Sequence, residues 1–145
     1  MSSTASTSIP RWFWLAAGGA LIWNLIGVMT YVVSVTMSAD AIAALPEAEQ
    51  RLREATPAFV TSAYAIAVFT GTFGAIFLLL RRNWAVPAYS ISLVALLVQF
   101  GYMFLAMNSI ATTGAVSAIL PAIIIIIGLL MLRFAHSARR KGWLR

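Results

Sequence analysis

Apolar residues fill four long stretches of this chain, and short polar segments separate them. The stretches cover about residues 12–37, 58–80, 84–107 and 114–132. A helix needs about 20 apolar residues to cross a hydrocarbon core of about 30 Å. Because every backbone amide in lipid must bond within the protein, each stretch should be a helix. The pattern therefore predicts an all-α fold, a polytopic membrane four-helix bundle.

The composition indicates a membrane protein rather than a soluble domain. Of the 145 residues, 61% are hydrophobic and 10% are charged, and the mean hydropathy is +0.91. That share of charge is too small to cover the surface of a soluble domain. We expect residues 10–145 to form a single membrane domain, preceded by a disordered start at residues 1–9 that is rich in Ser and Thr.

The charged residues are sorted by sign between the stretches. All four acidic residues lie in the loop 38–57, together with two of the ten basic residues. The other basic residues lie before the first stretch, at Arg81–Arg82 and in the tail 133–145. Because basic loops stay in the cytoplasm, both termini are predicted to be cytoplasmic, and the loops 38–57 and 108–113 are predicted to face outward.

The net charge of +6 does not indicate a nucleic-acid partner, since basic residues beside spans are topology signals. We expect the tail to contact anionic lipid headgroups instead. The tail should extend the fourth helix by one or two turns, and Gly142 can end it. Trp143 and Leu144 would then lie at the headgroup level.

The first outer loop carries a helical pattern of its own. Apolar residues recur at helical spacing between Leu45 and Ala55, and Pro46 can open a helix there. Glu47 precedes Arg51 by four residues, a spacing at which an ion pair supports a helix. The pattern predicts a short amphipathic helix that lies on the outer interface or caps the bundle.

Two further positions constrain the bundle. The connection Arg81–Asn83 is very short, so the second and third spans should be antiparallel neighbours. Pro121 lies inside the fourth stretch, where it should kink the helix and free the carbonyl of Ser117.

Each stretch carries a stripe of small or polar residues at helical spacing, and such stripes face protein rather than lipid. The stripes predict an interior polar seam, with Ser117 on the fourth stripe and these residues at its centre: Asn24, Tyr31, Tyr64, Gln99 and Tyr102. Two interpretations compete. The seam either holds the helices together by hydrogen bonds or forms a site for an uncharged polar solute. The residue types alone favour hydrogen bonds between helices, in which case replacing Asn24 or Gln99 with Leu should weaken the bundle by about 0.6 kcal/mol.

The spans contain no ionisable acid, base or histidine, and these are the residues that usually mark ion coupling or proton relay in a membrane. There is no cysteine, and the single histidine, His136, stands among basic residues next to the fourth span. One histidine cannot supply both axial ligands of a buried haem. We therefore expect no enzyme activity, no metal and no cofactor, and we interpret His136 as an interface residue.

Five short segments together resemble a known family. They are WNLIGV at 23–28, LPEA at 45–48, TPA at 56–58, RRNWAVP at 81–87 and KGWLR at 141–145. The chain resembles a family of small proteobacterial four-span inner-membrane proteins that are often labelled "sugar transporter". The resemblance implies a four-span fold, the bacterial inner membrane and a transport activity, and it carries over no functional residues.

Two functions follow from these observations. The first is a small transporter or binder of an uncharged polar, sugar-like solute, built as a homo-oligomer because four spans enclose little volume. The second is a non-transporting accessory or assembly subunit of a larger membrane complex. A polar, water-accessible cavity lined by Asn24, Gln99 and Tyr102 would favour the first function. A dry seam in which those groups are fully paired would favour the second.

Overall fold

A computed structural model describes residues 8–145, so most of the predicted disordered start at residues 1–9 lies outside the described residues. Within this part the chain is all-α, with no strand. Four helical segments are long and apolar enough to cross a membrane: Arg11–Thr36, Ala58–Leu79, Ala85–Ala106 and Ala115–Arg140. The prediction of four apolar helices in an integral membrane protein is therefore confirmed.

The first two long helices are α1, Arg11–Thr36, and α4, Ala58–Leu79. The third consists of α5, Ala85–Gly101, and a π-helical turn, Tyr102–Ala106. The fourth consists of a 3-10 turn, Ala115–Ala118, followed by α7, Ile119–Arg140.

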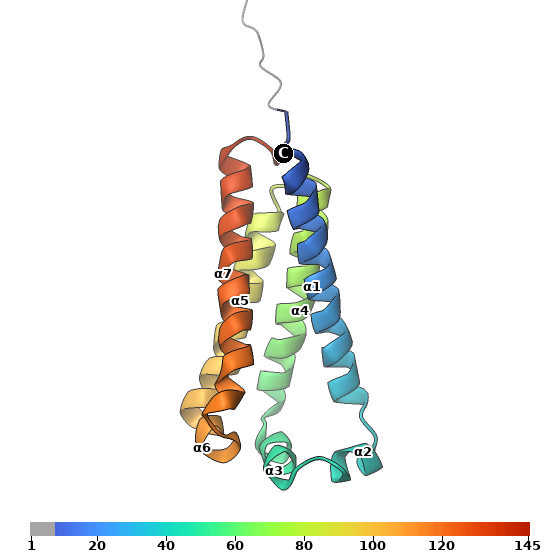
Figure 1. Cartoon of the computed structure of the whole chain (residues 1–145), viewed down its shortest axis with the longest axis vertical. Coiled ribbons are helices and arrows are strands. Elements are labelled where there is room, and N and C mark those ends of the chain that lie inside the picture. Colours follow the sequence, from blue (N-terminus) through green and yellow to red (C-terminus); the bar gives the residue numbers. More distant parts are fainter. Residues whose placement is uncertain (1–7) are drawn as a thin grey trace, which may run out of the picture.

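The four helices pack in chain order. Helix α4 lies between α1 and α5, and α5 also packs against α7. Figure 1 shows α1 and α7 close together where α1 begins and α7 ends, and further apart toward the opposite end. We call the first of these the basic end, because it carries Arg11, Arg81–Arg82 and Arg139–Lys141. The opposite end, with α2, α3 and α6, is the loop end.

Aromatic side chains close the basic end. Phe13 has no exposed surface, and its ring packs 5.6 Å from each of the rings of Phe134 and Trp143. The ring of Trp12 covers the same two rings at 5.7 and 5.6 Å. Residues from both ends of the described chain thus form one cluster that fastens α1 to α7.

The last residues fold back onto the bundle. Gly142, with φ of 71°, ends α7 and turns the chain. The amide of Arg145 donates to the carbonyl of Arg81, and its own carbonyl accepts from the amide of Asn83 at 2.9 Å. Nε of Arg81 donates to the carbonyl of Trp143 at 2.9 Å. Trp143 and Leu144 are therefore buried against the bundle.

Short helices form the loop end: α2, Ala39–Ala43; α3, Glu47–Ala55; and α6, Ser109–Thr113. In α3, Arg51 pairs with Glu47, but both side chains are exposed and such pairs contribute little stability. Nη1 of Arg53 donates to the carbonyl of Ser34 at 2.7 Å, which ties α3 to the end of α1.

Pro121 is the third residue of α7, and the helix type changes from 3-10 to α just before it, at residues 118–119. A proline in a first helical turn needs no partner for its missing amide. The irregular backbone of the fourth span therefore lies at its beginning.

Candidate functional site

A cavity of about 470 Å³ lies inside the bundle, between α1, α4, α5 and α7. Volumes of about 300–1,000 Å³ are typical of small-molecule sites. Most of its lining residues are apolar or small. The polar side chains in its wall come from three helices: Asn24, Thr30, Tyr64, Tyr89, Ser92 and Gln99.

Gly71 of α4 lets the polar groups of α1 and α5 meet behind the cavity. A methyl group at this position would collide with Oδ1 of Asn24 and would stand 3.1 Å from Oγ of Ser92. Gly74, one turn later, has the ring of Tyr89 at 3.0 Å from the place of a Cβ. The two glycines thus make room for side chains that would otherwise push α1 and α5 away from α4.

Two of the polar side chains are paired within the protein. Nδ2 of Asn24 donates to the carbonyl of Ala20 at 2.8 Å and lies 3.6 Å from the sulfur of Met131. Oγ of Ser92 donates to the carbonyl of Ala67 at 2.7 Å. The Asn24–Ala20 bond lies within α1, whereas the weak Asn24–Met131 contact joins α1 to α7 and the Ser92–Ala67 bond joins α5 to α4.

Two other polar side chains in the wall are buried without a partner. Tyr89 is 2% exposed and Gln99 is 7% exposed. The hydroxyl of Tyr89 and Oε1 of Gln99 have no hydrogen-bond partner among residues 8–145. A buried polar group without a partner costs about 1–3 kcal/mol. The protein therefore tolerates two destabilising groups on residues of one cavity wall, although the two polar atoms themselves have almost no exposed surface.

The six predicted site residues separate into two groups. Asn24, Tyr64 and Gln99 line the cavity. Tyr31 does not, and its ring stands edge-on to the ring of Tyr64 at 5.3 Å. Tyr102 packs against Phe59 at 4.9 Å.

Ser117 lies at the loop end, outside the cavity wall. Its hydroxyl donates to the carbonyl of Gly114 at 2.6 Å and bonds to Oγ1 of Thr113 at 2.7 Å. Pro121, by contrast, lines the cavity. His136 is exposed on α7 and does not line the cavity, and residues 8–145 contain no cluster of side chains that could hold a metal ion.

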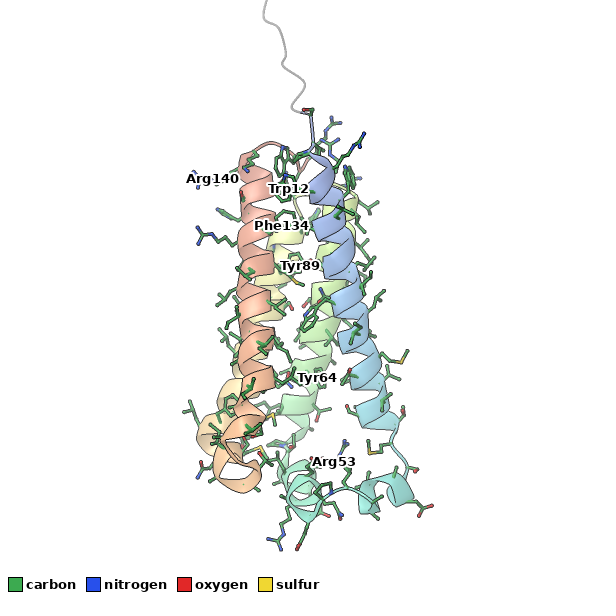
Figure 2. The ribbon with its side chains drawn as sticks, in the orientation of Figure 1. Trp12, Arg53, Tyr64, Tyr89, Phe134 and Arg140 are labelled. Atoms are coloured by element: carbon green, nitrogen blue, oxygen red, sulfur yellow. The ribbon has the colours of Figure 1, made fainter. Side chains whose placement is uncertain are left out.

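Tyr89 is the site residue that the sequence analysis missed. It stands three residues before Ser92 and ten before Gln99, so the three share one face of α5. Figure 2 shows Tyr89 nearer the basic end and Tyr64 nearer the loop end. Gln99 follows Tyr89 by ten residues of α-helix, a rise of about 15 Å. The unpaired hydroxyl of Tyr89 and the unpaired Oε1 of Gln99 therefore belong to opposite ends of the cavity.

Comparisons of the chain with known protein families, with curated proteins and with solved structures find no match. The function is therefore argued from the cavity itself.

Proposed function

We propose that the protein is an integral membrane protein that binds a small uncharged molecule in the cavity between its four long helices, and that it acts as a carrier for that molecule. The observation that carries the proposal is the pair of buried, unpartnered groups on Tyr89 and Gln99. A protein that used these side chains only to join helices would pair them, as it pairs Ser92 of α5 with the carbonyl of Ala67 of α4. A bound hydroxyl can donate to Oε1 of Gln99, and a bound hydroxyl or carbonyl can accept from the hydroxyl of Tyr89.

The ligand is uncharged because no ionisable acid or base lines the cavity. An ion in an apolar wall costs far more than a neutral polar group unless an opposite charge pairs with it. The transport activity implied by the family resemblance agrees with this proposal, and the mostly apolar wall favours a ligand less polar than a sugar.

Mass spectrometry tests the proposal on protein purified in mild detergent from its native membrane. The wild-type protein should retain a small molecule that Gln99→Leu does not retain. The matched control is Val94→Leu, which changes an exposed residue of α5 outside the cavity wall. If wild-type protein carries no small molecule that depends on Gln99, the binding proposal is wrong.

The accessory-subunit hypothesis draws on a different observation. In the most apolar stretch of the fourth span, no residue is buried inside the bundle. This helix can therefore pack against lipid, against a second copy of the chain or against a larger complex. Co-purification of a stoichiometric partner, lost when exposed α7 residues such as Leu129 and Leu130 are changed to Trp, would favour this second function.

For the threading we propose that the basic end faces the cytoplasm across a bacterial inner membrane, since eight basic residues gather there or beside it. The chain has no cysteine, so a single introduced cysteine shows directly on which side of the membrane its position lies. An impermeant thiol reagent on intact cells should label Glu49→Cys and leave Arg82→Cys unlabelled. Labelling at position 82 alone would mean that the threading is inverted.

A further inference from the structure

We propose that the ligand is a slender, lipid-soluble molecule with one or two hydroxyl or carbonyl groups, and that it reaches the cavity from the hydrocarbon core, between α1 and α7. This inference rests on the proposed binding function and specifies the ligand class and its route.

The exposed part of the cavity wall identifies the route. The lining residues of α4 and α5 are buried or half-buried, so these helices form the closed back wall. The exposed lining residues all belong to α1 and α7: Ile26 is 57% exposed, Leu120 is 60% exposed, and Thr30 is also exposed. The hydroxyl of Thr30 donates to the carbonyl of Ile26 at 2.9 Å, so it has no hydrogen left to donate to a ligand. The mouth is therefore an apolar opening between two membrane-spanning helices.

The mouth spans the outer part of the hydrocarbon core. Ile26 follows Arg11 by 15 residues of continuous helix, a rise of about 22 Å. Leu120 precedes Arg140 by 20 residues, a rise of about 30 Å, which is the thickness of the core. At the basic end, Phe13 and Ala17 have no exposed surface and close the space between the helices to water.

A second hollow extends the path along the seam between α1 and α7. It has a volume of about 300 Å³ and is lined by residues of these two helices only. Trp23 and Met131 line both hollows, so their side chains separate the outer groove from the cavity. Met131 is a flexible side chain, and its contact with Asn24 is a weak sulfur bond of 3.6 Å. A small rotation of this side chain would join the two spaces.

The shape and the polarity of the cavity fit a slender amphiphile. Spread over the rise of about 15 Å between Tyr89 and Gln99, the volume of about 470 Å³ leaves a section of only about 30 Å². Tyr89 brings a buried hydroxyl that can donate or accept, Gln99 brings a buried carboxamide oxygen that accepts, and Tyr64 adds a further hydroxyl to a wall that is otherwise mostly apolar. The terminal torsion of a glutamine is broad, so the Gln99 amide can turn toward a ligand within its own rotamer. A single apolar chain with a neutral polar group satisfies both requirements.

Photolabelling in proteoliposomes tests the inference with a defined probe, 1-decanol that carries a diazirine in its chain. Mass spectrometry should place the label on cavity residues such as Leu96 and Ile124, and unlabelled 1-decanol in excess should remove it. Decanoate at neutral pH should compete poorly, because its charge has no partner in the wall. Gln99→Leu should weaken binding about tenfold, the loss expected for one hydrogen bond.

The mouth is tested by a variant at its exposed rim. Leu120→Trp fills the opening at an exposed position and should abolish cavity labelling, whereas Leu129→Trp, exposed on α7 outside the cavity wall, should not. Label that is spread evenly over lipid-facing positions such as Val94, and that excess 1-decanol does not remove, would overturn the inference.

A melting assay separates the two proposals. If monosaccharides raise the melting temperature of the wild type but not of Gln99→Leu, and 1-decanol raises neither, the ligand class is wrong and the binding function stands. If neither class of molecule binds in the cavity, both proposals are wrong.

Discussion

The two ends of the bundle use the same helices in opposite ways. At the basic end, Phe13 is fully buried and the returning tail is bonded to the α4–α5 turn through Arg81. Toward the loop end, α1 and α7 separate and leave a cavity whose wall contains unpaired polar groups. The aromatic cluster satisfies its side chains within the protein, whereas the cavity wall leaves the hydroxyl of Tyr89, nearer the basic end, and Oε1 of Gln99, nearer the loop end, without a partner. The comparison indicates that the basic end supplies the stability that the site does not.

The largest expected effect is at the basic end. Phe13→Ala removes the ring at the centre of the aromatic cluster and should cost about 3–5 kcal/mol of unfolding free energy, as for a buried aromatic residue. Denaturant titration in detergent micelles measures this cost. Leu15→Ala is the control, because Leu15 is exposed on the same helix and should change stability far less. Equal effects of the two variants would mean that the cluster does not fasten α1 to α7.

A smaller effect is expected where α1 approaches α4. Gly71→Ala introduces a methyl group that collides with the Asn24 side chain and should cost about 1–3 kcal/mol. The combination with Asn24→Ala should cost less than the sum of the single changes, since it removes the atom that collides. Gly101→Ala is the control, because a Cβ there meets no atom within 4 Å. Additive costs in the double variant would show that Gly71 does not face Asn24.

The smallest effect concerns the paired part of the polar seam. Asn24→Leu removes the bond to Ala20 and the weak contact with Met131, and should cost about 0.6 kcal/mol, as intramembrane hydrogen bonds do on average. Leu97→Ile, an exposed position on α5 outside the cavity wall, serves as the control in the same thermal unfolding assay. A gain in stability on replacing Asn24 would place this amide among the unpaired groups.

The length of the apolar stretches was enough to predict the helices, because a helix pairs all the backbone amides of such a stretch within a bilayer. The fold of the tail was not predictable in the same way. Trp143 and Leu144 have the composition of interface anchors, and only the turn at Gly142 and the bonds to Arg81 bring them into the core. Local composition does not report a contact between residues so far apart in the chain.

Only part of the site could be predicted from the sequence, and the reason is similar. Helical spacing identified the polar face of α5 through Gln99 but extended it to Tyr102, where the π turn begins and the α-helical spacing ends. The same face continues in the other direction to Tyr89, which the stripe omitted. Whether a side chain on that face is paired depends on its neighbours on other helices, and a single sequence does not contain that information.

The sign of one stability change tests the central claim most directly. If Oε1 of Gln99 is buried and unpaired in the ligand-free protein, Gln99→Leu replaces a destabilising group with an apolar one of similar size. The variant should then be more stable than the wild type by about 1 kcal/mol in ligand-free detergent solution, and Tyr89→Phe should shift in the same direction. The variant should also bind 1-decanol about tenfold more weakly. A Gln99→Leu protein that is less stable than the wild type would show that this amide joins the helices, and it would contradict the account of the cavity as a binding site.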